Sequence, residues 1–169
     1  MWISESTAAV LSHIFRLTLH KIYLVNSGIR LKVPIWQIFK HDLSKYWLSE
    51  IFAYSQFFFM NRKNPKKWRY AWLHHINHNR HHWEYYLSRS TNEKYHGKYL
   101  EMPRSYAREM VADWMSASKV KTGSWDISEW LRRTWPKMRF HDDTSIYVKK
   151  LLHQNGYNID KIIKGAADG

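Results

Sequence analysis

Apolar residues recur every three or four positions along most of the chain, which is the spacing of one face of an α-helix. No stretch shows the regular alternation of apolar and polar residues that is typical of a β-strand. Residues 61–68 are basic and residues 90–101 are polar, so both stretches are expected to be loops. The spacing predicts helices over about 5–27, 34–43, 49–59, 68–86, 103–118, 125–135 and 144–155.

Glycine and proline mark the expected ends of these helices. Gly28 is expected to stop the first helix, because glycine favours the conformation that follows a helix end. Pro34 and Pro103 suit the first turn of a helix, where a missing backbone N–H costs little. The sequence therefore predicts an all-α fold with one helical-bundle domain of about six or seven helices over residues 1–155. A loose, Gly-rich C-terminal tail is expected over residues 156–169.

The composition is that of a folded domain without disulfides. A chain of 169 residues with 44% hydrophobic and 17% aromatic residues can build one sizeable core. Cysteine is absent, so disulfide bonds and thiolate metal sites are excluded. The N-terminus lacks the basic start and apolar run of a secretion signal, and no apolar stretch is long enough to span a bilayer. We therefore expect a cytoplasmic protein without a membrane partner.

The chain carries a strong excess of positive charge. Lysine and arginine together number 27 against 14 acidic residues, which gives a formal net charge of +13. Such a charge attracts anions, such as nucleotides, nucleic acid or an acidic membrane face. The charge indicates an anionic partner but does not choose among these classes, and a merely solubilising role is the alternative.

Histidines gather in HHINHNRHH, residues 74–82. If this stretch is helical, a step of about 100° per residue brings its five imidazoles within an arc of about 120°. Asn79 is a poor helix former, so it could instead cap a new helix at residue 80. Neutral imidazole nitrogens suit borderline metals such as Mn, Fe, Co, Ni and Zn. The five histidines are His74, His75, His78, His81 and His82.

A stronger sign of a metal site is HDLSK, residues 41–45. His41 and Asp42 offer a nitrogen donor and an oxygen donor from adjacent positions, and a carboxylate between two cations can bridge them. His20 lies on the helix predicted before this pair, and Asp113 lies on a helix predicted after it. The chain therefore carries His, His-Asp, several histidines and Asp in that order, on separate predicted helices.

This order resembles the HD-domain superfamily of metal-dependent phosphohydrolases. In this resemblance His20 matches the first histidine, His41-Asp42 the central pair and Asp113 the last aspartate. Lys45 matches a lysine that often follows the pair. The resemblance implies an HD-like helical domain. Superfamily members with two metals add two histidines between the pair and the last aspartate, a role open to His74 or His75 and to His81 or His82.

A closer resemblance is to a family of short proteins found in phage and bacterial genomes, to which no activity is firmly assigned. This family often carries His-Pro where the chain has His141-Asp142, which leaves the role of His141 open. If the chain is phage-encoded, the host cytoplasm is its expected location. Five segments follow the family pattern in order, from about residue 19 to residue 152: HKIYLV, HDLSKYWLSEIFAY, AWLHHINHNRHHWEYY, EMPRSYAREMVADW and LRRTWPKMRFHDDT.

The superfamily and the residue chemistry together predict hydrolysis of a phosphate ester, with a nucleotide as the expected small anionic substrate and a metal-activated water as nucleophile. One or two divalent ions are expected, and Mn, Fe, Co, Zn, Ni and Mg are not distinguished. The expected ligands are His20, His41, Asp42 and Asp113 for one ion, and Asp42, His75 and His82 for a second. His74, His78, His81 and His141 are additional candidates as ligands or neighbours. Lys45, Glu84 and Glu109 are candidate catalytic residues, and Lys45 and Arg80 are candidate substrate contacts.

Two other functions fit the same sequence. Some HD-fold proteins hold two irons with four histidines and two aspartates and oxidise a small substrate with O₂, so a diiron oxygenase is one alternative. The other is a non-catalytic module that binds nucleic acid through its positive charge. The sequence does not indicate the oligomeric state.

Overall fold

The chain folds into packed helices, as its apolar spacing predicts. The computed structural model describes residues 4–60, 63–92, 94 and 97–164, and these ranges hold eight α-helices, three 3₁₀ helices and no strand. An isolated bridge joins Leu87 to Tyr99. The predicted all-α, single-domain class is confirmed, with slightly more helices than expected. The elements are α1 (Glu5–Arg30), α2 (Ile35–Lys40), η1 (Leu43–Tyr46), α3 (Leu48–Phe59), α4 (Pro65–His78), η2 (Trp83–Tyr86), α5 (Arg104–Thr122), α6 (Ser128–Thr134), η3 (Trp135–Lys137), α7 (Asp142–Gln154) and α8 (Ile159–Lys164).

Helix α1 runs past the glycine that is predicted to stop it. Its first turn is capped by Ser4, whose side chain accepts a hydrogen bond from the backbone N–H of Thr7. Gly28 stays helical, and the helix ends at Arg30. A Cβ atom at Gly28 would lie 2.7 Å from Cδ1 of Ile38. Glycine therefore serves the close approach of α2 to α1 at this point and does not end the helix.

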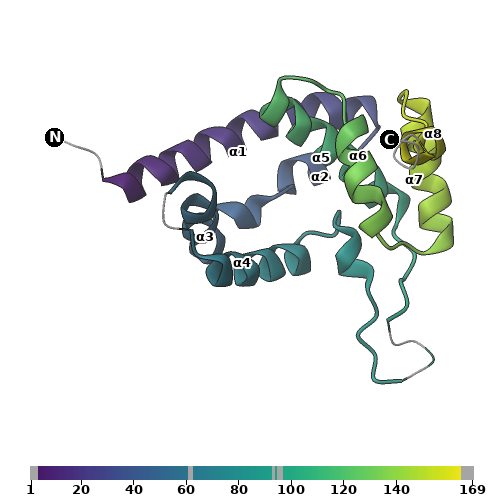
Figure 1. The fold of residues 1–169 in the computed structure, drawn as a ribbon, viewed down its shortest axis with the longest axis horizontal. Helices are drawn as coiled ribbons and strands as arrows, with labels where there is room; N and C mark the ends of the chain where they lie inside the picture. Colours follow the sequence, from purple (N-terminus) through teal and green to yellow (C-terminus); the bar gives the residue numbers. More distant parts are fainter. Residues whose placement is uncertain (1–3, 61–62, 93, 95–96, 165–169) are drawn as a thin grey trace.

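The helices pack in pairs, and α5 packs against both α1 and α7. Helix α1 lies along one edge of the molecule and packs against α5 and α3 (Figure 1). Helix α3 packs against α4, α5 against α7, and α6 against α8. The main hydrophobic core includes Ala107 and Val111 of α5, which have no exposed surface. A smaller cluster of Ala53, Tyr54 and Ala71 joins α3 to α4.

The histidine-rich stretch is two segments and not one helix. Helix α4 ends just before Asn79, whose φ of −121° and ψ of 102° are not helical. The Asn79 side-chain amide donates to the His75 carbonyl and to the Ser44 hydroxyl, so its own hydrogen bonds favour a break over another helical turn. His81 and His82 therefore do not share a helix face with His75, and they reach it from the turn that follows α4.

The C-terminal segment is packed where the sequence predicts a loose tail. Tyr157 and Ile159 are buried, and the Tyr157 hydroxyl donates to the Trp125 carbonyl. Helix α8 packs against α6, and its isoleucines extend the main core. The predicted loose tail is therefore wrong for residues 157–164. Burial of their apolar side chains stabilises a packed segment, whereas a flexible tail would leave these side chains in water. Residues 165–169 lie outside the described ranges.

Within the described ranges, none of the helices combines the length and the hydropathy that a bilayer-spanning segment requires. Helix α1 is long enough, with 26 residues, but it carries His13, Arg16, His20 and Lys21.

Candidate metal centre

Buried histidines and carboxylates from four parts of the chain meet at one place. They come from α1, from the turn between α2 and η1, from α4 and the turn after it, and from α5. All six predicted ligands converge there, and Glu109 and His81, which the sequence offers as an alternative to His82, join them. The donor atoms form three groups, in each of which all atoms lie within 4.8 Å of one another: His20, His41, Asp42 and Asp113; Asp42, His75, His81 and His82; and His41, His81 and Glu109.

The backbone between α2 and η1 turns two adjacent side chains toward this cluster. Asp42 has a left-handed conformation with φ 56°, which is uncommon for a residue other than glycine. Lys21 of α1 holds this turn, because its ammonium group donates to three backbone carbonyls. These belong to Ile38, Phe39 and His41, at 2.8, 2.9 and 2.7 Å. Helix α1 thus caps the end of α2 and fixes the His-Asp pair.

Four donor atoms form the first ligand group. His20 Nε2 lies 3.0 Å from Asp113 Oδ1, and His41 Nε2 lies 3.3 Å from the same oxygen. His41 Nε2 is also 3.2 Å from His20 Nε2 and 3.3 Å from Asp42 Oδ2. Ligands that bind one ion at about 2.0–2.2 Å lie about 2.8–3.6 Å from each other in tetrahedral or octahedral geometry. The spacing of this group therefore suits a single metal ion.

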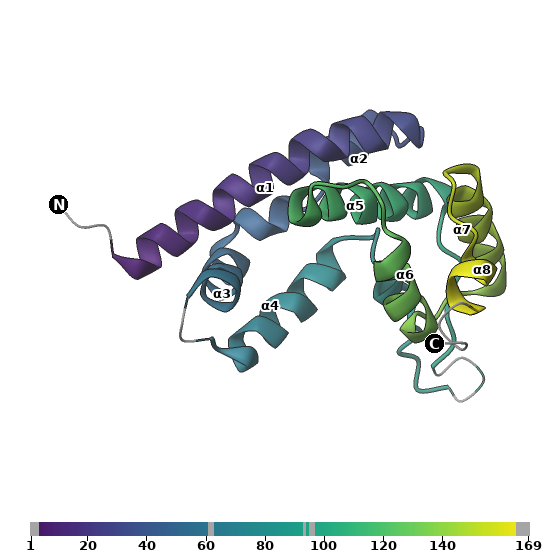
Figure 2. The same ribbon diagram turned by 45° about the horizontal axis from the view of Figure 1, so that its top comes forward.

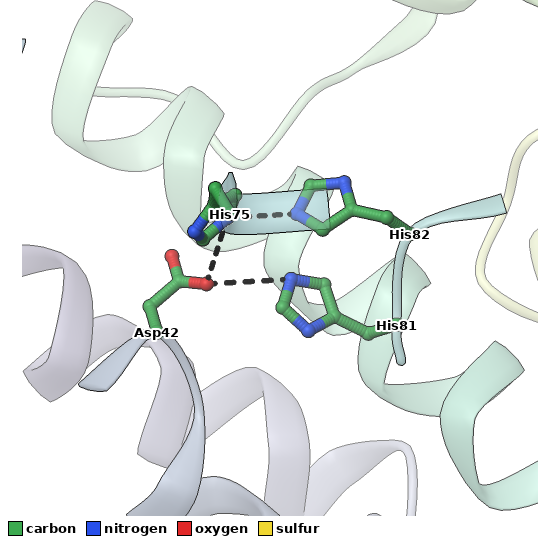
Figure 3. Close-up of side chains that lie close together, drawn as sticks. All are labelled: Asp42, His75, His81 and His82. Carbon is green, nitrogen blue, oxygen red and sulfur yellow. Dashed lines mark hydrogen bonds and ion pairs between the residues drawn. The ribbon is translucent and has the colours of Figure 1, made fainter. Parts of the chain in front are cut away.

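Asp42 belongs to the second ligand group through its other oxygen (Figure 3). Asp42 Oδ1 lies 3.3 Å from His75 Nε2 and 3.5 Å from His81 Nε2. His82 Nε2 completes the group at 2.9 Å from His75 Nε2. One carboxylate thus faces two sets of donors with its two oxygens, which is the arrangement expected of a carboxylate that bridges two cations.

Two buried atoms of the second group have no hydrogen-bond partner within the described part of the chain. They are Asp42 Oδ1 and His81 Nε2. A buried carboxylate oxygen or imidazole nitrogen that is left unpaired is costly unless it binds a proton or a metal ion. The residues present therefore fit a metal ion. Imidazole nitrogens and carboxylate oxygens suit several divalent metals, so the donor set does not identify the ion.

Buried carboxylates behind the imidazoles set the direction in which the rings point. Glu109 Oε1 accepts a hydrogen bond from His41 Nδ1 at 2.9 Å and lies 3.3 Å from His81 Nδ1. Glu50 Oε2 accepts from His75 Nδ1 at 3.0 Å. Because Nδ1 of each ring faces a carboxylate, the neutral form of each ring carries its proton on Nδ1 and keeps the Nε2 lone pair for a cation.

The two aspartates of the cluster are anionic. Burial opposes the ionisation of Asp42, but the positive charges of His41 and Lys45 hold its pKa well below the usual value. Burial also opposes the ionisation of Asp113, and hydrogen bonds from His20 and His41 hold its pKa well below the usual value. Two buried negative charges this close to one another draw positive charge into the site.

The imidazoles of the cluster are of two kinds. Burial and the charge of His41 lower the pKa of His81, and burial above all lowers the pKa of His82 well below 6.5. Both rings are therefore neutral, which is the form that binds metals. Burial acts in the same direction on His41 and His75, but the negative charge of Asp42 and hydrogen bonds to carboxylates raise their pKa.

The predicted catalytic and substrate-binding residues do not all lie beside the donor groups. The Lys45 ammonium group donates to Asp42 Oδ2. Glu84 is half-buried, and its Oε2 lies 4.0 Å from His82 Nδ1. Arg80 is exposed, and its guanidinium group lies over a tyrosine ring, 5.8 Å from the ring centroid. Lys45 and Glu84 therefore border the donor groups, whereas the contact found for Arg80 is with an aromatic side chain.

Three of the additional candidate histidines lie outside the donor groups. His74 Nδ1 pairs with Glu50 Oε1 at 2.6 Å. His78 is exposed and stacks on the His74 ring at 4.0 Å between centroids. His141 caps the N-terminus of α7, where its Nδ1 accepts a backbone N–H. The sequence leaves open whether His74 or His75 is a ligand, and of these two it is His75 that joins the donor groups.

Sequence reasoning missed two residues that support the site, Glu50 and Lys21. Glu50 is fully buried on α3 and pairs with His74 and His75. A signal was present, because Glu50 is the only acidic residue in the apolar, aromatic stretch 46–60, and a buried carboxylate needs a partner. Lys21 directly follows His20 on a helix with few charges, which is a similar signal.

Comparison with known proteins finds a match to a family whose function is unknown. The sequence pattern of a family described as "Family of unknown function (DUF5662)" matches residues 7–154. The search of curated proteins found no match, and neither did the search of solved structures. The matched range includes every residue of the three donor groups.

Proposed function

We propose that this chain, which belongs to the family of unknown function DUF5662, is a metal-dependent hydrolase of a phosphate ester, with a nucleotide as the expected substrate. The observation that carries the proposal is the position of Asp42, whose two oxygens face two separate sets of histidine and aspartate donors. The order of His20, His41-Asp42 and Asp113 resembles that of HD-domain phosphohydrolases. The convergence of these four side chains supports the resemblance.

The chemistry follows from the first and second donor groups, which share the Asp42 carboxylate. Divalent ions bound there would lower the pKa of a water molecule and neutralise charge on phosphoryl oxygens. The residues of the chain prepare the site for this reaction. Glu109 and Glu50 orient the imidazoles, and Lys21 holds the turn that carries Asp42. Lys45 supplies an ammonium group beside Asp42 that suits a phosphoryl oxygen.

The substrate class rests on charge. A chain with a formal net charge of +13 attracts phosphate-bearing molecules. Arg80 is exposed and directly precedes His81, so it is the second candidate contact for an anionic substrate. An anionic substrate would compete with the present contact of its guanidinium group with a tyrosine ring.

The test is product release after reconstitution with Mn²⁺ or Co²⁺, assayed on a panel of nucleotides and phosphodiesters. The wild type should bind metal and release product. Asp42→Ala should lose both metal and turnover while its helical circular dichroism stays largely intact. Asp143→Ala removes an exposed aspartate of α7 and should retain both properties. A wild-type protein that binds no stoichiometric metal after reconstitution would contradict the proposal.

The same preparations separate the hydrolase from the two other functions. Iron after anaerobic purification, with a mixed-valence EPR signal and O₂ uptake, would indicate a diiron oxygenase, whose ligand types are the same. Salt-sensitive binding of DNA or RNA without turnover, unchanged in His41→Ala and Asp42→Ala, would indicate a non-catalytic module.

A further inference from the structure

Helix α1 has a second apolar face that the rest of the described chain does not cover. Its inner face, which includes Leu17 and Leu24, is buried against the other helices. Figure 2 shows α1 along one edge of the molecule, with α5 on its inner side. The outer face carries large apolar side chains that are 42–64% exposed: Leu11, Phe15, Ile22, Val25 and Ile29. We call these five residues and Thr18 the outer stripe.

The outer stripe follows a heptad pattern. It consists of two series with a step of seven residues, which are Phe15, Ile22 and Ile29 in one and Leu11, Thr18 and Val25 in the other. These are the a and d positions of a helix that pairs with another helix. All six residues are exposed, and Thr18 is the only polar one. At 1.5 Å per residue the stripe is about 27 Å long.

We propose that the outer stripe is a homodimer interface, in which α1 packs antiparallel against α1 of a second copy of the chain. This inference does not depend on the proposed function. The stripe is its own complement, because a two-fold axis near residue 20 pairs an a position with a d position in every layer. The layers pair Leu11 with Ile29, Phe15 with Val25, and Thr18 with Ile22 of the second copy.

The distribution of charge favours a second copy over an acidic protein or a lipid surface. Two copies that each carry a net charge of +13 repel each other most strongly where charged residues meet. The outer stripe contains no charged residue. Between Leu11 and Ile29 the only charged residues are Arg16 and Lys21. Arg16 leans over the Phe59 ring of α3 at 5.2 Å, and Lys21 is held by the carbonyls of α2. A helix that lies on an anionic membrane instead carries Lys and Arg beside its apolar face.

The area of the outer stripe suits a weak but specific dimer. Its apolar side chains present roughly 500 Å² of surface, which is in the upper range for the largest patch of a typical monomer. Pairing two copies would bury roughly 1,000 Å², near the lower limit for a specific interface. We therefore expect a dissociation constant on the order of 1–10 μM, which corresponds to a dimer that forms reversibly at ordinary protein concentrations.

Sedimentation velocity of the full chain over a range of micromolar concentrations tests the interface. The wild type should show a monomer–dimer equilibrium, and Ile22→Glu should be monomeric throughout because it places a charge in the central layer. Ile146→Glu changes an isoleucine of α7 that is 66% exposed, outside the stripe, and should behave as the wild type. Thr18→Ile completes the apolar seam and should tighten the dimer by about tenfold.

The orientation can be tested by cross-linking, because the chain contains no cysteine. A mixture of the Leu11→Cys and Ile29→Cys variants should form an intermolecular disulfide under mild oxidation. Leu11→Cys alone should not, since its two copies lie at opposite ends of an antiparallel pair. Cross-linking of Leu11→Cys with itself and not with Ile29→Cys would contradict the antiparallel arrangement.

Two results would overturn the interface itself. One is a wild type that stays monomeric at every concentration, and the other is a dimer that persists in Ile22→Glu. If the monomeric wild type binds vesicles of phosphatidylserine and phosphatidylcholine and Ile22→Glu does not, the outer stripe is a lipid-binding surface and the dimer proposal is wrong.

Discussion

At the scale of single residues, Asp42 connects the two donor groups, and the order of residue types along the chain predicted it. The sequence could not decide between His74 and His75, because neighbouring histidines on a helix differ only in which way they point. Both rings pair with Glu50 through Nδ1, and of the two it is His75 whose Nε2 faces Asp42. His81 and His82 both join the donor groups. Helix α4 ends at Asn79, so these two histidines do not follow the helical spacing from which the sequence prediction was made.

His82 belongs to the second donor group only, so its loss should separate the two ions. His82→Ala should weaken the binding of the second ion by at least about 100-fold, since even the loss of an outer partner of a ligand costs about 10–100-fold. Binding of the first ion should change much less. Titration of apo-protein with Mn²⁺ or Co²⁺ by calorimetry measures both steps.

The matched control is His78→Ala, which removes an exposed histidine of the same sequence stretch and should leave both binding steps unchanged. If His82→Ala weakens the binding of both ions equally, or of neither, His82 is not a ligand of the second ion.

His13 provides a prediction about pH that is separate from the metal ligands. Burial, aided by the charge of Lys45, lowers its pKa from 6.5 to about 4. Between these values the unfolded chain takes up a proton that the folded chain refuses, so the folded state loses stability as the pH falls from 6.5 to 4. The loss is at most about 3.5 kcal/mol, since each pKa unit corresponds to about 1.4 kcal/mol.

His13→Phe keeps the stacking on the Tyr54 ring and removes the titration. Urea denaturation at pH 7 and at pH 4.5 should therefore show a smaller acid-induced loss of unfolding free energy in this variant than in the wild type. An equal loss in both proteins would show that His13 does not refuse the proton in the folded state.

At the scale of helices, apolar spacing predicted most elements because each helix buries one face. The predictions failed where side chains or tertiary contacts decide. Gly28 does not stop α1, because α2 approaches it closely, and Asn79 ends α4 through its own hydrogen bonds. Helix α8 forms because apolar residues that are sparse in a Gly-rich sequence find a surface on α6. Sequence spacing contains no information about such contacts between distant segments.

The contact between Lys21 and α2 is the clearest case in which one helix positions the site on another. Lys21→Met should leave the carbonyls of Ile38, Phe39 and His41 without their donor and should destabilise the protein by about 1–3 kcal/mol. It should also weaken the binding of the first metal ion, because the turn that carries His41 and Asp42 is no longer held by Lys21. Urea denaturation and metal titration measure the two effects.

Lys40→Met is the control for Lys21→Met, because it removes an exposed lysine from the end of α2, the helix whose last carbonyls Lys21 contacts. It should change both quantities little. If the two variants prove equally stable and bind the first ion equally well, α1 does not hold the turn at Asp42.

At the scale of the whole molecule, the candidate metal centre joins α1, α4 and α5 with the turn after α2, so it connects the smaller α3–α4 cluster to the main core. Bound cations would balance the buried charges of Asp42 and Asp113. Removal of the metal by a chelator should therefore lower the thermal midpoint, and ligand excess should raise it by mass action. In Asp42→Ala the chelator should have no effect, and a similar shift there would place the stabilising metal elsewhere.

Anomalous diffraction from crystals of the protein reconstituted with Mn²⁺ or Co²⁺ would show whether the Asp42 carboxylate binds two metal ions. We expect two anomalous peaks, one beside Asp42 Oδ2 among His20, His41 and Asp113, and one beside Asp42 Oδ1 among His75, His81 and His82. Peaks that lie away from Asp42, or the absence of any peak between its two sets of donors, would contradict this expectation.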